Sequence, residues 1–404
     1  MRFYADETGT VLIVPTEELR PGAKLAVGVM HPRQREQELL KSGFVLDDDV
    51  IARLRELGVS HVFVDFPGLD DLDAMLLPLL SPERRAVYEL IKSAIASNET
   101  SVRPVVKYSA YRSATRAFIK SLVVDARNAV LLDVLSRGSV APESEIEHAT
   151  TVAHLALVLG MKLEAYLIRE RPRLTPAHAR DLTGLGVAAM LHDIGKTKLP
   201  EHLRRHHALD APPGREDLAL WQSHAQLGFE LLRGDVDAAV SATVLHHHQR
   251  FDGGGFPELP RGTEKTRLGG RRIHIFARIL QAADLFERLA NRADGTRRTN
   301  YETLHLLRVH YSGHLDPEVL ATMPQVIPPF GPGRRVTLSD GGAAIVTGFH
   351  PHSPYQPPVK RFDIAQQKAA DDAVDLRMTP GLTITHIDGV TLAGLEAVRL
   401  AQVA

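Results

Sequence analysis

A histidine and an aspartate at residues 192–193 have the side chains of a metal site. They follow an apolar run, residues 187–191, and precede Gly195. Imidazole and carboxylate groups bind Zn, Fe and Mn, and the two oxygens of a carboxylate can bridge two ions. A polar helix end closed by a glycine is the competing interpretation, because glycine commonly ends helices. The pair alone does not decide between the two.

Three consecutive histidines give a second chemical signal. His246, His247 and His248 end an apolar helical pattern and lead into a glycine-rich loop, residues 249–257. Glycine lets a backbone approach a ligand closely. A surface histidine tract is the alternative, but the apolar residues before the run favour a binding site.

Three further polar residues lie in helical patterns. His148 is next to an apolar helix face, His224 is in a helix expected over residues 216–232, and Asp284 is in a strongly apolar segment. Taken singly, each histidine is more simply explained as a hydrogen-bonded core or surface residue. An isolated buried aspartate is costly unless it is paired or binds a cation. Together with the other histidines, these residues indicate a metal centre.

The composition restricts the chemistry. The 404 residues include 20 histidines and no cysteine, so a metal site must use nitrogen and oxygen ligands, and thiolate chemistry is excluded. The formal net charge of -1 gives no overall attraction to polymeric nucleic acid or to a membrane surface. The N-terminus lacks the pattern of a signal peptide, and no apolar run approaches the roughly 20 residues of a membrane span. We therefore expect a cytoplasmic protein.

The elements that position these residues are mainly helical. We expect a small α/β module over residues 1–75, with strands at 11–14 and 61–65, then a helical domain over 80–326, and a β-rich extension over 329–404 with strands within 335–348 and at 382–386. The expected helices of the central domain cover residues 114–135, 142–159, 175–193, 216–232, 235–248, 273–291 and 301–311.

Residues 140–325 resemble the HD-GYP family of HD-domain metal-dependent phosphohydrolases, which are cyclic di-GMP phosphodiesterases. The matches fall in five segments of the chain. They are His148 and residues 152–153; residues 192–196 and 199–200; His224 and Gly228; residues 247–257; and residues 278–279 and Asp284. The resemblance implies an HD-domain helical bundle. It also implies that seven side chains bind metal: His148, His192, Asp193, His224, His247, His248 and Asp284.

The resemblance further implies how these ligands are divided. His148, His192, Asp193 and Asp284 would hold one ion, the remaining three histidines would hold the second, and Asp193 would bridge them. Seven nitrogen and oxygen ligands suit two divalent ions, Fe or Mn, better than one Zn. The activity implied is hydrolysis of cyclic di-GMP to pGpG, GMP or both, by a hydroxide that the two ions activate.

Other residues receive roles at this site. Asp193 and Lys196 are the candidate catalytic residues, and Lys196, Arg250, Arg278, Gly253 and Gly255 are candidate substrate contacts. A helix-end lysine and ordinary arginine salt bridges are the alternatives for the three cations. The partners implied are cyclic di-GMP, diguanylate cyclase (GGDEF) proteins and a second copy of the chain.

Three positions depart from the family pattern. Phe256 replaces the tyrosine of the Gly-Tyr-Pro signature, Gln249 replaces a glutamate, and Ser144 stands where some members carry a glutamate for a third ion. We therefore expect two ions rather than three, with Glu145 out of register. The first two changes also leave open a non-hydrolytic cyclic-dinucleotide receptor or scaffold, and hydrolysis of another nucleotide is a further alternative.

Overall fold

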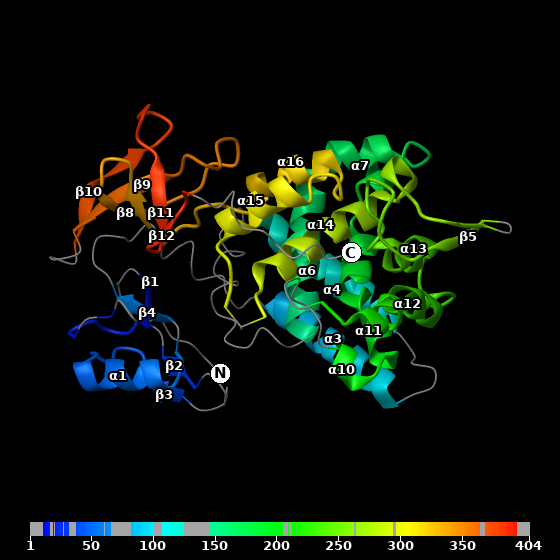
Figure 1. Ribbon diagram of the computed structural model, residues 1–404, viewed down its shortest axis with the longest axis horizontal. Helices are drawn as coiled ribbons and strands as arrows, with labels where there is room; N and C mark the ends of the chain where they lie inside the picture. Colours follow the sequence, from blue (N-terminus) through cyan, green and yellow to red (C-terminus); the bar gives the residue numbers. More distant parts are fainter. Residues whose placement is uncertain are drawn as a thin grey trace. The chain divides into compact units, whose positions relative to one another are not determined.

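The computed structural model describes most of the chain. The described residues are 11–16, 19, 21–26, 28–31, 38–59, 61–65, 82–100, 107–124, 145–204, 209, 212–261, 264–293, 296–363 and 368–393. The chain divides into two compact units (Figure 1). One comprises Leu80–Leu132 and Pro142–Val326, and the other comprises Met1–Leu79, Asp133–Ala141 and Ile327–Ala397. The three-domain division 1–75, 80–326 and 329–404 stays a prediction.

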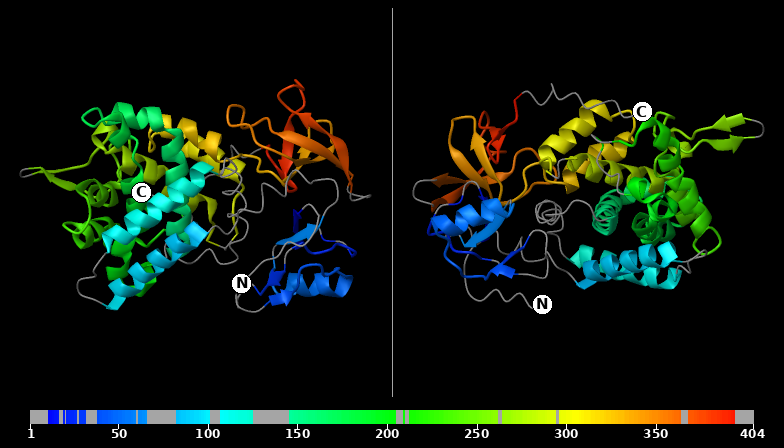
Figure 2. Two further views of the ribbon diagram at one scale, coloured as in Figure 1. Left: turned by 180° about the vertical axis from the view of Figure 1, so that it is seen from behind. Right: turned by 60° about the horizontal axis from the view of Figure 1, so that its bottom comes forward.

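The first unit is helical, and the prediction of a mainly α protein with small α/β and β-rich parts is confirmed. Its elements are α3 (Pro82–Thr100), α4 (Tyr108–Val124), α6 (Glu145–Lys162), α7 (Glu164–Glu170), α8 (Pro176–Ala179), α9 (Thr183–Leu191), η4 (Ile194–Lys198), α10 (Glu201–Arg204), α11 (Arg215–Gln222), α12 (His224–Leu232), α13 (Ala238–His246), η5 (Gly270–Arg272), α14 (Ile275–Ala290), α15 (Asn300–His310) and α16 (Pro317–Val326). A hairpin of β5 (Leu259–Arg261) and β6 (Glu264–Thr266) projects from these helices (Figures 1 and 2).

Three central helices form the core that carries the site. Every residue of α14 is buried, as are all of α9 except Gly184 and most of α6. An apolar helix such as α9 is stable only in the interior, and the buried charged residues of α14, among them Arg278, Asp284 and Glu287, have charged partners there. α6 packs against both α9 and α14, and α13 packs against α9. Polar residues at the ends of α9 and α13 are therefore held inside the protein.

Two of the predicted helices are broken. The helix expected over 175–193 is α8 and α9, because Asp181 between them accepts hydrogen bonds from the backbone N–H and the hydroxyl of Thr183 and restarts the helix. The helix expected over 216–232 is α11 and α12. At that break the Ser223 hydroxyl donates to the carbonyl of Leu220, a local bond that competes with helix hydrogen bonding. Residues 125–144, which include parts of two predicted helices, lie outside the described residues.

The second unit contains short strands and one described helix. β1 (Val11–Pro15) pairs antiparallel with β4 (His61–Asp65), and β2 (Val29–Met30) pairs with β3 (Glu38–Leu40). Helix α1 (Asp48–Glu56) begins at Asp47, which caps it by accepting from the N–H of Val50. The C-terminal strands are β7 (Arg335–Leu338), β8 (Ala343–Val346), β9 (Pro358–Asp363), β10 (Lys368–Asp375), β11 (Ile384–Ile387) and β12 (Val390–Thr391). They form one antiparallel sheet in the order β10-β9-β8-β7-β11-β12.

No described helix has, by itself, the length and apolar character that a membrane span needs. Helices α6 and α7 meet these requirements only as a pair, and that pair is bent by 82°.

Candidate metal centre

The seven predicted ligands converge in one buried cluster. They come from α6, the ends of α9 and α13, the start of α12, and α14. Two overlapping groups have ligand atoms within 4.8 Å of one another: Asp193 with His224, His247 and His248, and Asp193 with His148 and His192. Asp284 lies beside the second group, with its Oδ1 3.2 Å from Nε2 of His148. The cluster has the residue types and spacing needed to hold metal.

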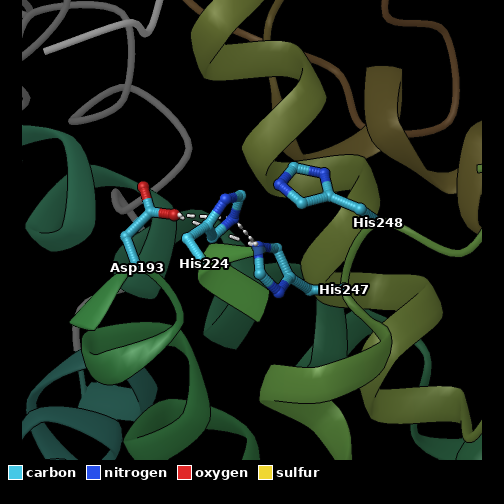
Figure 3. Close-up of side chains that lie close together, drawn as sticks. All are labelled: Asp193, His224, His247 and His248. Atoms are coloured by element: carbon cyan, nitrogen blue, oxygen red, sulfur yellow. Dashed lines mark hydrogen bonds and ion pairs between the residues drawn. The ribbon is translucent and has the colours of Figure 1, made fainter. Parts of the chain in front are cut away.

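Asp193 joins the two groups through separate oxygens. Its Oδ1 is 3.4 Å from Nε2 of His224 and 4.0 Å from Nε2 of His247. Its Oδ2 is 3.3 Å from Nε2 of His192 and 3.5 Å from Nε2 of His148. Figure 3 shows the carboxylate turned toward the rings of His224 and His247, with His248 close by. Each oxygen therefore faces a different pair of imidazoles.

Backbone carbonyls fix which nitrogen of three histidines faces inward. Nδ1 of His192 donates to the carbonyl of Ala189, Nδ1 of His224 to Trp221, and Nδ1 of His247 to Val244, at 2.6–2.8 Å. A carbonyl oxygen can only accept, so Nδ1 carries a proton in each ring, and Nε2 of the neutral ring presents a lone pair. In this neutral state, three lone pairs point at Asp193.

A cation fits this arrangement better than the protein atoms alone do. Asp193 Oδ1 is buried and has no hydrogen-bond partner among the described residues. The Nε2 atoms of His224 and His247 are 3.3 Å apart, a close approach of two lone pairs. Buried polar atoms left without partners are costly. Ions held between the carboxylate and the imidazoles would satisfy them.

The charges of three of the candidate ligands, His224, His247 and Asp193, also suit metal binding. Burial lowers the pKa of His224 to about 3, and burial together with His192 lowers the pKa of His247 to about 4. Burial would raise the pKa of Asp193, but His192 and Lys196 outweigh it and hold this pKa well below its usual range. Two neutral imidazoles and an ionised carboxylate are therefore ready at neutral pH, the states in which these groups bind metals.

Glu287 is a functional residue that the sequence analysis missed. Its Oε2 is 2.5 Å from Nδ1 of His148, and its Oε1 accepts from the amide of Asn291 at 2.6 Å. Burial would lower the pKa of His148, but the carboxylates of Glu287 and Asp284 raise it to about 10. Glu287 follows Asp284 by three residues on α14 and so shares its helix face. In the sequence, this three-residue spacing was the feature that could have indicated that Glu287 lies near the site.

Lys196 lies at the bridging carboxylate. Its Nζ donates to Oδ2 of Asp193 at 2.6 Å, and its side chain is 2% exposed. Nζ is also 5.8 Å from the centre of the Trp221 ring. The lysine is therefore held at the carboxylate that joins the two groups, and its catalytic role stays a prediction.

A close contact between η4 and α12 brings Asp193 to His224. A Cβ atom on Gly195 would lie 2.0 Å from the carbonyl oxygen of His224 and 2.5 Å from the nitrogen of Gly228. No residue with a side chain fits between these backbones. Glycine at 195 is required for the two halves of the centre to meet.

The glycine-rich loop is held together by its own backbone. Gly253 and Gly255 have φ of +87° and +80°, and a Cβ on Gly255 would lie 2.1 Å from the carbonyl oxygen of His248. Gln249 fastens the loop, because its side-chain NH2 donates to the carbonyl of Pro257 and its oxygen accepts from the N–H of Leu268. The turn itself explains both glycines, and their contact with substrate stays a prediction.

Phe256 and Arg250 have partners of their own. The centre of the Phe256 ring lies 4.4 Å from the centre of the His248 ring and 5.7 Å from the centre of the Trp221 ring. Arg250, on the loop, forms an ion pair with Asp252 at 2.5 Å. It keeps 31% of its side chain exposed, so a ligand contact remains open to it.

Arg278 is placed differently from its predicted role. Its guanidinium bonds to Glu170, to Asp316 and, at 2.8 Å, to the hydroxyl of Tyr166, and its side chain is 2% exposed. These partners raise its pKa. The structure favours the ordinary salt bridge that was the alternative for Arg278, and we correct its assignment as a substrate contact.

Two predictions concern residues around the ligands. His246, the first of the three consecutive histidines, lies outside both groups of candidate metal ligands among the described residues. Ser144, on which the choice of two ions over three depends, is outside the described part of the chain. Glu145 is closer to the centre than its spacing suggested, because it lines a small pocket together with Asp193, and burial raises its pKa.

Comparison with known proteins identifies the helical unit. The HD domain family matches residues 150–319. The chain is 28% identical over 361 residues to a cyclic di-GMP phosphodiesterase of Pseudomonas aeruginosa, covering 81% of this chain and 80% of that protein. It is 31% identical over 109 residues to a cyclic di-GMP phosphodiesterase response regulator of Xanthomonas campestris, covering 26% of this chain and 25% of the relative.

Two more proteins are similar over different spans. A 3'3'-cGAMP-specific phosphodiesterase of Vibrio cholerae is 30% identical over 184 residues, which are 43% of this chain and 36% of that protein. An HD-GYP-type protein of Bdellovibrio bacteriovorus matches 78% of this chain and 98% of its own, with 15% identity and a TM-score of 0.43. Residues 150–319 are thus similar to the HD domain family, and the resemblance of the chain to the HD-GYP family is confirmed.

Proposed function

We propose that this protein is a metal-dependent phosphodiesterase that hydrolyses cyclic di-GMP with the help of two divalent ions. The observation that carries the proposal is the placement of the two Asp193 oxygens against separate histidine pairs. One carboxylate that faces two sets of lone pairs is suited to bridge two ions. The relatives from Pseudomonas aeruginosa and Xanthomonas campestris, both named cyclic di-GMP phosphodiesterases, support the choice of substrate.

The ligands divide between the two ions by their distances to Asp193. His148, His192 and Asp284 would hold one ion on the side of Oδ2, and His224, His247 and His248 would hold the other on the side of Oδ1. Fe or Mn suits this set of imidazoles and carboxylates. When bound, such a pair of ions lowers the pKa of water to give a nucleophile at neutral pH and neutralises charge on the attacked phosphate.

The chain's own residues position the substrate and handle its charge. In the reaction a water oxygen attacks phosphorus, the bond from phosphorus to the ribose 3′ oxygen breaks, and a proton reaches that oxygen. Lys196, fixed by Asp193 at 2.6 Å, carries donors that can bind a phosphate oxygen or give the leaving oxygen its proton. Arg250 has donors for a second phosphate oxygen. The products would be pGpG, GMP or both.

The test combines metal analysis with product chromatography. Protein purified without oxygen and loaded with Fe(II) or Mn(II) should bind about two ions per chain and hydrolyse cyclic di-GMP. Asp193→Ala should lose both ions and turnover, because both halves of the centre share this carboxylate. Asp217→Ala is the matched control, since Asp217 is exposed and pairs with His202. Fully loaded protein that binds cyclic di-GMP without cleaving it would instead establish the receptor alternative.

A related substrate is the second candidate. The Vibrio cholerae relative is named a 3'3'-cGAMP-specific phosphodiesterase, so another cyclic dinucleotide has direct support. Competition between cyclic di-GMP and 3'3'-cGAMP in one assay gives the ratio of their kcat/KM values. A ratio in favour of 3'3'-cGAMP would replace the proposed substrate but not the proposed reaction. Binding to GGDEF proteins and to a second copy of the chain remain predictions of the resemblance.

A further inference from the structure

Arg288 is a cation at the centre that neither the motif nor the ligand set assigns. It follows Asp284 by four residues on α14, so both side chains share a helix face. Nη1 of Arg288 is 3.6 Å from Oδ2 of Asp284. Its guanidinium carbon lies 5.2 Å from the centre of the Trp221 ring. Arg278, ten residues earlier, lies on a different face and is bonded to Glu170 and Asp316.

Asp284 presents its two oxygens to different surroundings. Oδ1 faces Nε2 of His148 at 3.2 Å and Nε2 of His192 at 3.8 Å. Oδ2 faces Arg288 at 3.6 Å and Nδ1 of His248 at 3.9 Å. Arg288 therefore lies beside Oδ2 of Asp284, whereas Oδ1 is the oxygen that would bind the ion near His148 and His192.

The side chains of the centre differ in their exposure. Among the described ligands, Asp193 and His248 keep 9% of their side chains exposed, whereas the other five keep 0–3%. Arg288 keeps 10%. Solvent therefore reaches Asp193, His248 and Arg288 more readily than the other residues of the centre.

We propose that Arg288 is a substrate-binding residue, which contacts a phosphate oxygen of the cyclic dinucleotide beside Asp284. The proposal rests on the proposed function and extends it. Each phosphodiester of the substrate carries one negative charge, and a guanidinium can bind such a group through two parallel N–H···O bonds. With Lys196 at Asp193 and Arg288 at Asp284, one cation stands beside each carboxylate ligand. The arginine role that the sequence gave to Arg278 thus passes to Arg288.

A purely structural role for Arg288 makes different predictions. If the arginine only held Asp284 in place, its loss would release an ion and reduce kcat. If it binds phosphate, its loss leaves the ions in place and weakens substrate binding, which raises KM. Metal content and KM therefore separate the two roles without relying on the rate alone.

The only tryptophan of the chain gives a direct optical signal for the site. Trp221 is in contact with His224, His248 and Phe256 and lies under Arg288. A phosphate that draws Arg288 away from the ring changes the environment of the indole. Ligand binding can thus be followed by intrinsic fluorescence, with no label.

The experiment compares Arg288→Ala and Arg288→Lys with the wild type, and Arg233→Ala serves as control because Arg233 is 63% exposed and pairs with Glu230. All measurements use metal-loaded protein. They give the metal content per chain, kcat and KM for cyclic di-GMP, and the Kd for inorganic phosphate from calorimetry and from Trp221 fluorescence. For Arg288→Ala we expect an unchanged metal content, with KM and the phosphate Kd raised about 10- to 100-fold. Lysine should restore part of the loss, because it keeps the charge but not the planar pair of donors.

Three results would overturn the proposal. They are an unchanged KM and phosphate Kd in Arg288→Ala, the loss of an ion from that variant, and an equal effect in Arg233→Ala. If the wild type fails to cleave cyclic di-GMP, the proposed function fails. The phosphate and cyclic di-GMP affinities of the variants then still decide whether Arg288 binds phosphate.

Discussion

Three of the candidate ligand histidines are oriented by the same kind of hydrogen bond to the backbone. His192, His224 and His247 follow the ends of α9, α11 and α13, and each ring donates to the carbonyl three residues before it. The last carbonyls of a helix have no partner within it, so the imidazole satisfies one and is fixed in return. His148 differs, because its acceptor Glu287 is 139 residues away. Its orientation depends on the packing of α6 against α14.

This dependence predicts a specific effect of mutating Glu287. Glu287→Ala removes the acceptor that fixes the His148 ring, so we expect about 10- to 100-fold weaker binding of one of the two ions. Glu287→Gln keeps an acceptor oxygen and should lose less. The measurement is metal per chain after dialysis against chelators of increasing strength.

A matched control separates this effect from general loss of charge. Glu318→Ala removes an exposed glutamate that pairs with Arg169 and should bind both ions as the wild type does. Retention of both ions by Glu287→Ala under every chelator would show that Glu287 does not support the centre. Circular dichroism confirms that each variant is folded.

At the residue scale, the sequence identified the ligands but not their supporting partners. The seven candidate ligands were implied by the resemblance to the HD-GYP family, and the structure brings their side chains together. Glu287 and Arg288 share the helix face of Asp284, so their spacing carried a signal that could have been used. The partners of Arg278, on α7 and before α16, depend on how helices pack, which no spacing within one helix reveals.

At the scale of elements, the centre depends on the contact between η4 and α12. Gly195→Ala would place a Cβ 2.0 Å from the carbonyl oxygen of His224, and neither backbone can give way locally. Overpacking in a core typically costs about 1–3 kcal/mol, and a clash with backbone belongs at the upper end. We expect such a loss in the free energy of urea unfolding, together with weaker metal binding.

Gly313→Ala is the control for this prediction. A Cβ on Gly313 would meet only Oδ2 of Asp252, at 3.7 Å, which is an ordinary van der Waals distance. This variant should unfold like the wild type. If Gly195→Ala also unfolds like the wild type and binds metal normally, the two segments are not held in contact as the structure shows.

The sequence predicted the helices better than it predicted their interruptions. The apolar residues of α6, α9 and α14 recur at helical spacing because most of each helix is buried, so the existence of these helices was readily recognised. The breaks at Asp181 and Ser223 arise from single side-chain hydrogen bonds to the backbone. Ser and Asp make such bonds in some contexts and face solvent in others, so their types alone could not locate the breaks.

For the whole molecule, the buried histidines predict how the stability of the metal-free protein depends on pH. The pKa values of His224 and His247 are lowered to about 3 and about 4, so between about pH 4 and 6.5 the unfolded chain binds more protons and stability rises with pH. The pKa of His148 is raised to about 10, so between 6.5 and about 10 the folded chain binds more protons and stability falls. Stability should be greatest near pH 6.5.

Urea unfolding of chelator-treated protein at pH 5, 6.5 and 9 measures this dependence. Each of these histidines changes the free energy of unfolding by up to about 1.4 kcal/mol per pH unit. His148→Gln should flatten the decline on the alkaline side and leave the acid side unchanged. Equal midpoints at pH 6.5 and pH 9 in the wild type would contradict the raised pKa of His148.

The separation of the ligands along the chain has a consequence for the lifetime of the protein. The chain has no cysteine, so no disulfide ties distant segments together. Its ligands come from five segments between residues 148 and 284, and ions bound there would act as cross-links that close long loops of chain. Chains deprived of metal would then be both inactive and easier to unfold and degrade. The amount of intact protein, as well as its activity, would follow the supply of metal.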